Sequence, residues 1–191
     1  MSGLRNDIAG AVLAGGKSTR MKSNKALLSV DGVPFIRRIV DTLERRFSRI
    51  YISANRADDY VFLNHPIIPD VYEDGGPLAG IHAVLKSVSA AYVFTVSCDV
   101  PFISTDVIDT LIEKTEPDTI LIADDGTHIH PLIGIYPRSV CDNLGKYLQS
   151  GERKARRFLE TVDHKRVDVS HAAGAVKNIN TVEEYQREIR R

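Results

Sequence analysis

Apolar and polar positions follow two alternating patterns along this chain. Short apolar runs rich in β-branched residues are separated by longer stretches in which apolar residues recur at helical spacing. The first pattern predicts strands and the second predicts amphipathic helices. Their alternation indicates an α/β fold with a mainly parallel, mixed and twisted sheet and helices on both faces. The predicted strands span residues 8–13, 49–54, 67–68, 92–97, 119–123, 132–136 and 166–169.

Apolar stripes and capping residues place the helices between these strands. The two clearest stripes consist of Ile36, Ile39, Val40, Leu43 and Phe47, and of Leu78, Ile81, Leu85 and Val88. Both have the spacing of one helix face. Ser104 is placed to cap a helix that runs to about Lys114, and the run from Thr181 to Glu184 has the pattern of a capping box. The second run predicts the start of a C-terminal helix.

Length and charge narrow the class of protein. The chain has 191 residues, which suits one domain over residues 1–191. Its 25 basic and 25 acidic residues cancel, so no overall field attracts a nucleic-acid backbone or an anionic membrane. No apolar run approaches membrane-spanning length, and Arg5, Asn6 and Asp7 interrupt the place where a signal peptide would be apolar. We expect a cytoplasmic protein that binds a small ligand.

Cysteine usage indicates neither a disulfide framework nor a zinc site. The chain has two cysteines, Cys98 and Cys141, which lie far apart and form no C-x-x-C spacing. We expect both to be reduced thiols that pack as small apolar residues.

The first predicted strand leads into the most informative segment of the chain. Gly15 and Gly16 follow it directly, and Lys17, Arg20 and Lys25 come soon after. Glycines let backbone N–H groups approach phosphate oxygens, and cations neutralise the phosphate charge. The segment therefore predicts a loop that binds a polyphosphate.

The spacing of the glycines excludes two better-known phosphate loops. A Walker loop ending at Gly16 and Lys17 would need a glycine at the position of Ala11. A dinucleotide-binding fingerprint needs a G-x-G-x-x-G spacing, which Gly10, Gly15 and Gly16 do not give. What remains is Leu-Ala-Gly-Gly-x-Ser-x-Arg-Met with a lysine four residues later, which resembles the signature loop of nucleotidyltransferases.

Two acidic residues directly follow predicted strands. In open α/β sheets ligands bind beyond the carboxyl ends of the strands, so Asp70 and Asp99 join Gly15 as candidates for one site. A carboxylate in the position of Asp99 suits Mg²⁺, because magnesium bound at phosphates usually takes one or two protein carboxylates. Alternatively, Asp99 caps the helix that follows, and Asp70 is a turn residue.

Several further segments occur in a fixed order along nearly the whole chain. They are Gly76-Pro77-Leu78-Ala79-Gly80-Ile81, Cys98-Asp99-Val100-Pro101-Phe102, His130-Pro131-Leu132 and Asn178-Ile179-Asn180-Thr181. Together with the first loop they resemble the molybdenum cofactor guanylyltransferase family. The resemblance implies the Rossmann-like fold of nucleotidyltransferases. It also implies a cytoplasmic, Mg²⁺-dependent enzyme that transfers GMP from GTP to the phosphate of molybdopterin and releases pyrophosphate.

The resemblance also implies roles for single residues. The implied GTP-binding residues are Leu13, Ala14, Gly15, Gly16, Lys25, Asp70 and Asp99. Lys25, Arg20 and Asp99 would act in catalysis, and Asp99 would also bind the metal. Arg20, Asn178 and Asn180 would contact the pterin. Asp70 would accept hydrogen bonds from the base or from the ribose, and the two asparagines alternatively shape the turn before the last helix.

Some positions depart from the family pattern or lie outside it. Lys22 stands where a glycine is common, and Ser53 stands where some members carry an asparagine, which leaves Asn55 as a substitute near the nucleoside. His128 and His130 form an H-x-H pair that favours a surface strand over a metal site. The basic segment Gly151–Arg157 either meets an anionic substrate or a partner protein, or forms a solvated helix face. A molybdoenzyme or a cofactor-delivery protein is among the candidate partners of the whole protein.

Three other functions remain open from the sequence. A cytidylyltransferase for the same pterin, or a transferase for a sugar phosphate, would keep the fold and change one substrate. A catalytically inactive GTP-binding regulator would keep the nucleotide site without turnover.

Overall fold

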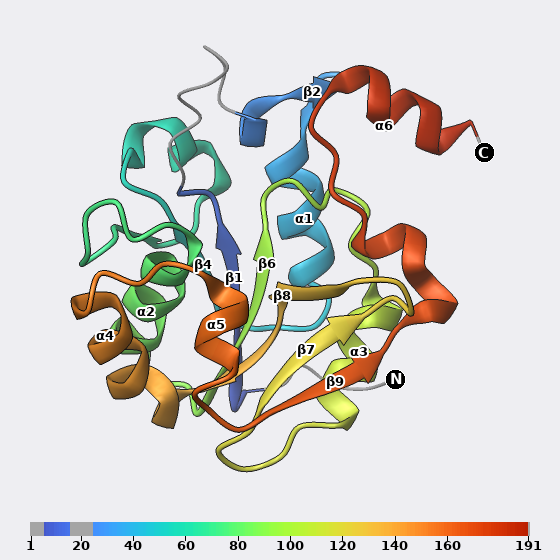
Figure 1. Ribbon diagram of the computed structural model, residues 1–191. Coiled ribbons are helices and arrows are strands. Elements are labelled where there is room, and N and C mark those ends of the chain that lie inside the picture. The colour runs from blue at the N-terminus through green and yellow to red at the C-terminus, as the bar shows by residue number, and fades with distance from the viewer. Residues whose placement is uncertain (1–5, 16–24, 191) are drawn as a thin grey trace.

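Seven strands form one mixed sheet in a computed structural model that describes residues 6–15 and 25–190. The strand order is β5-β4-β1-β6-β8-β7-β9 (Figure 1). The strands are β1 (Ile8–Leu13), β4 (Ile50–Ser53), β5 (Ile67–Ile68), β6 (Tyr92–Ser97), β7 (Ile120–Asp124), β8 (Ile129–Pro137) and β9 (His164–Asp168). Only β8 runs antiparallel to its neighbours within this sheet, so the prediction of a mainly parallel, mixed sheet is confirmed.

The last two strands begin earlier than the apolar pattern predicts. β8 begins at Ile129, and β9 covers His164–Asp168 instead of residues 166–169. The parallel register of β7 with β9 starts at the pair Ile120 and His164 and ends at the pair Asp124 and Asp168. As an edge strand, β9 exposes most of its side chains and needs few apolar residues. Pairing with β7 therefore sets its bounds.

Helices cover both faces of the sheet, as predicted (Figure 1). The helices on one face are α1 (Phe35–Leu43) and α3 (Thr105–Glu113), and those on the other are α2 (Pro77–Ser87), α4 (Cys141–Gln149) and α5 (Ala155–Leu159). Successive side chains of β1 point to opposite faces. Ile8 and Val12 join the first apolar cluster, whereas Ala9 and Leu13 join the second. The whole of β1 is buried, and it forms the centre of the fold.

The predicted α1 stripe extends past the end of the helix. α1 ends at Leu43, so Phe47 lies beyond it, yet Phe47 is buried and its ring stacks on Phe94 with centroids 5.5 Å apart. A Cβ atom on Gly10 would come within 2.9 Å of the Phe47 ring. The glycine in β1 thus lets Phe47 pack directly against the strand.

Both predicted capping residues form their hydrogen bonds. The Ser104 hydroxyl accepts from the Val107 amide at 3.4 Å and caps α3. At the start of α6 (Val182–Ile189), the Thr181 hydroxyl accepts from the Glu184 amide at 3.1 Å. The Glu184 carboxylate in turn accepts from the Asn180 amide at 2.6 Å. The last helix is therefore fixed at its first turn.

Short elements that the apolar pattern does not predict fill the remaining connections. A hairpin joins β2 (Ser29–Val30) to β3 (Val33–Pro34) through Asp31 and Gly32, which both have positive φ, as a tight two-residue turn requires. The 3₁₀ helices are η1 (Lys25–Leu27), η2 (Ala57–Leu63), η3 (Arg138–Val140) and η4 (Ser170–Val176). No helix among the described residues has the length and apolarity needed to cross a membrane.

We expect Gly134→Ala to destabilise the sheet strongly. A Cβ atom there would lie 2.1 Å from the Leu121 carbonyl oxygen of β7, and a backbone atom in a strand pair cannot move aside. The expected loss is about 3 kcal/mol, at the upper end for over-packing, or roughly 6–12 °C in Tm for a chain of this size. Thermal denaturation followed by circular dichroism measures it. Gly174→Ala is the control, because open space surrounds Gly174. Equal Tm values for the two variants would contradict the assignment.

Candidate functional site

A crevice is expected where the order of the parallel strands reverses direction, between β1 and β6. From β1 the chain passes through α1 on one face to reach β4, whereas β6 follows α2 on the opposite face. The carboxyl ends of β1 and β6 therefore form a topological switch point, where open α/β sheets bind ligands. The Cys98 amide, just after β6, donates to the carbonyl of Leu13 at 3.1 Å. This bond holds the two strand ends together.

Asp99 follows β6 at this crevice. Its Oδ1 atom is buried and accepts no hydrogen bond from any described residue. A buried, unpaired carboxylate oxygen costs free energy unless a ligand or a cation satisfies it. Hard divalent cations prefer such oxygen ligands. The position and the unsatisfied oxygen of Asp99 therefore fit the magnesium ligand that the sequence predicts.

Asp70 lies on the other side of β1, directly after the short strand β5. The Asn55 side chain holds it at two points: its Nδ2 donates to Asp70 Oδ2 at 3.0 Å, and its Oδ1 accepts from the Asp70 amide at 2.8 Å. The Ser53 hydroxyl faces Asp70 Oδ1 at 3.5 Å. Asn55, predicted as a contact for the nucleoside, is thus engaged in orienting the Asp70 carboxylate.

Two glycines bring the backbone close to this carboxylate. A Cβ atom on Gly15 would lie 3.5 Å from Asp70 Oδ2, and one on Gly80 would lie 2.4 Å from the Ser53 hydroxyl. Burial raises the pKa of Asp70, and the hydrogen bonds from Asn55 and Ser53 offset part of that rise. The carboxylate therefore lies beside the start of the glycine loop, in a position to accept hydrogen bonds and to repel phosphates.

The C-terminal segment reaches the site through the backbone of Asp99. The Ile179 amide donates to the Asp99 carbonyl at 2.7 Å, and the Ile179 side chain is buried. Its neighbours Asn178 and Asn180 are exposed and half-buried, respectively. The fold thus brings the two predicted pterin contacts next to the predicted metal ligand, although about 80 residues separate them in the chain.

The remaining predicted residues are distributed as follows. The Ala14 amide donates to the Ser53 carbonyl at 2.9 Å, next to Leu13. Lys25 begins η1, while Gly16 and Arg20 lie outside the described residues. Tyr60 also contacts this segment, although no pattern in the sequence predicts it: its hydroxyl donates to the Ala14 carbonyl at 3.3 Å. No sequence motif indicates Tyr60, because its hydrogen bond to Ala14 depends on how η2 packs against the end of β1.

The histidine pair is part of a hydrogen-bonded turn. His130 lies in β8, and its Nε2 is 2.8 Å from Asp125 Oδ2, while the His128 amide donates to Asp125 Oδ1 at 2.7 Å. Burial acts to raise the pKa of Asp125, but the hydrogen bonds from His130, Thr127 and His128 lower it further than burial raises it. Among the described residues no group of three His, Cys, Asp or Glu side chains is arranged to hold a metal.

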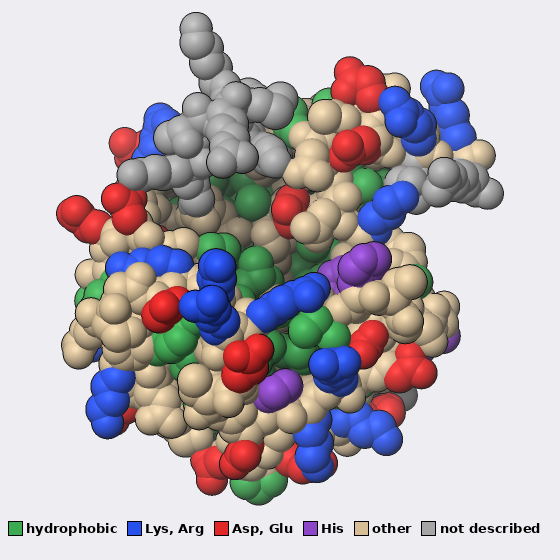
Figure 2. All heavy atoms as spheres, viewed as in Figure 1, with side chains coloured by type: hydrophobic (Ala, Val, Ile, Leu, Met, Phe, Trp, Pro, Cys, Tyr) green, Lys and Arg blue, Asp and Glu red, His purple; other side chains and the backbone are tan. Residues whose placement is uncertain are grey.

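The predicted basic segment has mixed roles. The Arg153 guanidinium donates to the carbonyls of Asp74, Leu148 and Glu152, so this residue ties the loop after β5 to the end of α4. Arg157 forms an ion pair of 3.6 Å with Glu152. Lys154 and Arg156 are exposed. Figure 2 shows cationic side chains gathered on the face over α5 and β9, mixed with acidic ones.

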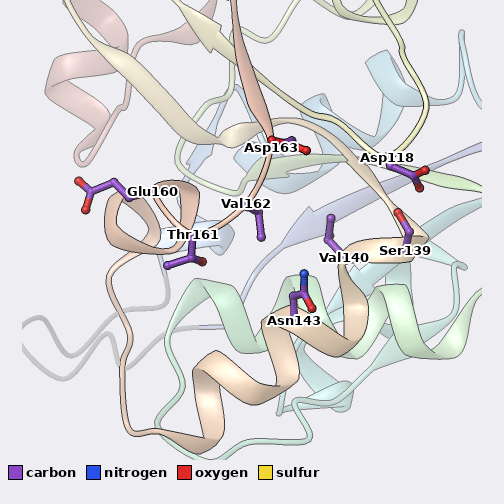
Figure 3. Close-up of a pocket in the computed structure, with 8 residues that line it drawn as sticks. All are labelled: Asp118, Ser139, Val140, Asn143, Glu160, Thr161, Val162 and Asp163. Atoms are coloured by element: carbon purple, nitrogen blue, oxygen red, sulfur yellow. The ribbon is translucent and has the colours of Figure 1, made fainter.

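A cavity of about 530 Å³ lies away from these residues (Figure 3). Its lining residues are Asp118, Ser139, Val140, Asn143, Glu160, Thr161, Val162 and Asp163. Asp118 and Asp163 come just before β7 and β9, so the cavity is at the amino ends of these strands. It is at the opposite edge of the sheet from Asp70 and Asp99 and includes no residue predicted for the site.

Comparison with known proteins places the chain in a family. A profile described as the MobA-like NTP transferase domain matches residues 10–168. The molybdenum cofactor guanylyltransferase of Serratia proteamaculans (strain 568) is 34% identical over 187 residues, covering 96% of this chain and 95% of the relative. The enzyme of the same name from Yersinia pestis (strain Pestoides F) is 33% identical and covers 93% of each chain. This chain belongs to the molybdenum cofactor guanylyltransferase family.

Solved structures show the same fold. A protein of Aquifex aeolicus VF5 superposes with a TM-score of 0.80 at 26% identity and covers 91% of this chain and 93% of its own. Molybdopterin-guanine dinucleotide biosynthesis protein A from Archaeoglobus fulgidus gives a TM-score of 0.77 at 24% identity, covering 94% and 96%. The resemblance predicted from the motifs, and the Rossmann-like nucleotidyltransferase fold that it implies, are therefore confirmed.

We expect Asp70→Asn to raise stability at neutral pH. The folded state raises the pKa of Asp70, mainly through burial, so folding disfavours its charged form. This cost is absent below the unfolded pKa, near 4, and grows as the pH rises through the folded pKa. The Tm advantage of the variant should therefore be small at pH 4 and larger at pH 7.

Thermal denaturation at a series of pH values measures this difference. Asp58→Asn, which removes an exposed carboxylate from η2, controls for the change in net charge. A Tm advantage that stays constant or shrinks as the pH rises would contradict the role of burial at Asp70.

Proposed function

We propose that this protein transfers GMP from GTP to the phosphate of molybdopterin, forming molybdopterin guanine dinucleotide and pyrophosphate. The observation that carries the proposal is the buried carboxylate oxygen of Asp99, which has no hydrogen-bond partner among the described residues and follows β6 where this strand is bonded to the end of β1. The names of the relatives from Serratia and Yersinia support the same reaction.

The two acidic residues support one orientation of GTP. Asp70 follows β5 and Asp99 follows β6, on opposite sides of β1 in the strand order. The Asp70 carboxylate carries no cation among the described contacts, so it favours neutral donors and disfavours phosphates. The nucleoside therefore lies toward Asp70, with its base or its ribose donating to the carboxylate, and the triphosphate lies toward Asp99.

The reaction needs little acid–base chemistry from the protein. The phosphate monoester of molybdopterin is largely ionised near neutral pH, so its oxygen attacks the α-phosphorus of GTP without a general base. The main obstacle is the repulsion between two anionic substrates and the charge on the departing pyrophosphate. Backbone N–H groups at Gly15 and Gly16, with Lys25 and Arg20, would lower this barrier by electrostatic stabilisation. Mg²⁺ held by Asp99 would supply further positive charge at the phosphates.

The C-terminal segment would bind the acceptor. Asn178 and Asn180 flank Ile179, which is anchored to the backbone of Asp99. Amide side chains both donate and accept hydrogen bonds, which suits the polar edge of a pterin. Arg20 would bind the phosphate of the pterin. We expect the protein to act in the cytoplasm and to pass its product to a molybdoenzyme or a cofactor-delivery protein.

A panel of nucleotides tests the substrates. Purified protein with Mg²⁺ and molybdopterin should release pyrophosphate from GTP in preference to CTP, ATP or UTP. A preference for CTP would make the protein a cytidylyltransferase, and turnover with a sugar phosphate instead of the pterin would replace the acceptor. GTP binding in a thermal-shift assay without turnover on any acceptor would indicate a regulator.

We expect Asp99→Asn to lower kcat by about a hundredfold or more, as with the loss of a charged contact in other active sites. The variant should fold normally, because the amide is isosteric with the carboxylate and is easier to bury. Pyrophosphate release and Tm measure the two effects. Asp41→Asn is the matched control, since Asp41 lies on the surface of α1 in an ion pair with Arg37. Activity of Asp99→Asn close to that of this control would remove Asp99 from the reaction.

A further inference from the structure

Tyr185 of α6 is the centre of an aromatic cluster behind the site. Its ring stacks on Phe102 with centroids 4.6 Å apart and on Phe35 with centroids 5.2 Å apart. The Arg38 guanidinium lies 5.3 Å from the centroid of the same ring. Although α6 is the last helix of the chain, Tyr185 is only 6% exposed. We call this group the Tyr185 cluster; its members are Leu28, Phe35, Phe102, Ile179, Val182 and Tyr185.

The Tyr185 cluster contains an apolar side chain from three of the segments that carry predicted site residues. Phe102 is three positions after Asp99, and Leu28 is three positions after Lys25. The Leu28 carbonyl also accepts from the Phe35 amide at 2.8 Å. Ile179, which is 1% exposed, lies between Asn178 and Asn180. The cluster therefore joins, on its buried side, segments that are far apart in the sequence.

These segments differ in how strongly the rest of the fold holds them. Asp99 continues from β6, which is paired on both sides, and the Cys98 amide adds a bond to Leu13. Phe35 begins α1, which packs on the sheet. In residues 178–180, the Ile179 amide donates to the Asp99 carbonyl, which follows β6. The Asn180 amide donates to the Glu184 carboxylate, within the capping box of α6. Packing of Ile179 in the cluster adds to these bonds in holding the segment.

We propose that Tyr185 is a positioning residue that holds Asn178 and Asn180 against Asp99. Ile179 is buried in the cluster, whereas Asn178 is exposed and Asn180 is half-buried. Fixing the Ile179 side chain in the cluster therefore fixes the backbone that carries both asparagines. Stacking of Tyr185 on Phe35 and Phe102 holds α6, and with it this segment, against the rest of the fold. The role in acceptor binding rests on the proposed function, whereas the anchoring of the segment does not.

Three variants separate positioning from general stability. Tyr185→Leu removes the ring stacking, and Tyr185→Phe keeps the ring and removes only the hydroxyl. Phe158→Leu is the matched control, because Phe158 is a fully buried aromatic residue of α5 in the apolar cluster on the opposite face of the sheet. All three substitutions preserve an apolar side chain, so the folded state is expected to persist.

Amide hydrogen exchange tests the anchoring without any substrate. Exchange reports local opening of single hydrogen-bonded amides. In Tyr185→Leu the Ile179 amide should exchange about tenfold faster relative to amides of β1, whereas Tyr185→Phe and Phe158→Leu should leave this ratio unchanged. An unchanged ratio in Tyr185→Leu, or an equal rise in Phe158→Leu, would overturn the proposal.

Kinetics then test the consequence for the reaction. In Tyr185→Leu we expect the KM for molybdopterin to rise about tenfold, because small displacements of positioning groups are costly. The Kd for GTP should stay within about twofold of the unmodified protein, and Tyr185→Phe should restore the KM. A matching rise in the KM of Phe158→Leu would show that the effect is general destabilisation, against the proposal.

A double-mutant cycle decides whether Tyr185 acts through the asparagines. If it does, adding Tyr185→Leu to Asn180→Ala should raise the KM little beyond that of Asn180→Ala alone, because coupled residues are not additive. Fully additive effects would overturn the proposal. If the unmodified protein transfers no nucleotide to molybdopterin, the proposed function fails, and hydrogen exchange still decides whether Tyr185 anchors the segment.

Discussion

The pairing of β1 with β6 is the interaction on which the site depends. Their register runs from the pair Ile8 and Tyr92 to the pair Leu13 and Ser97, so both strands end at the same level. The strand order reverses between β1 and β6, which marks a topological switch point where open α/β sheets bind ligands. Because β1 is buried over its whole length, its end is held rigidly. Gly15, two residues after β1, and Asp99, two residues after β6, therefore lie at neighbouring strand ends.

The two acidic residues of the site are held in different ways. Side chains from β4 and the residues after it, Ser53 and Asn55, satisfy the Asp70 carboxylate, whereas the buried Oδ1 of Asp99 has no partner among the described residues. A carboxylate already oriented by neutral groups suits recognition of hydrogen-bond donors. One that lacks a partner in a buried position suits a cation. The environments thus match the separate roles proposed for nucleoside and metal.

The buried side of the site is as important as the open side. Segments distant in the sequence meet in the Tyr185 cluster, where apolar packing supplies the free energy that a few backbone bonds cannot. Solvent-exposed polar contacts contribute little free energy, so the positions of the polar site residues depend on the apolar residues packed behind them. Stacking of Tyr185 on Phe35 and Phe102 provides that support for the C-terminal segment.

The sequence by itself determined the features that depend on near neighbours in the chain. Strand runs, the caps at Ser104 and Thr181, and the positions of Gly15, Asp70 and Asp99 directly after strands all follow from local periodicity and local hydrogen bonding. The order of the motifs then indicated the family, which the comparisons confirm.

Only the tertiary structure decided the features that depend on distant segments. Strand or loop pairing across the sheet produces three such features: the two hydrogen bonds between Asn55 and Asp70, the hydrogen bond from Ile179 to Asp99, and the start of β9. Phe47 lies beyond the end of α1 and packs against Gly10, which belongs to a strand far back in the sequence. Periodicity cannot show such pairings, because it records which residues prefer burial and not which neighbours bury them.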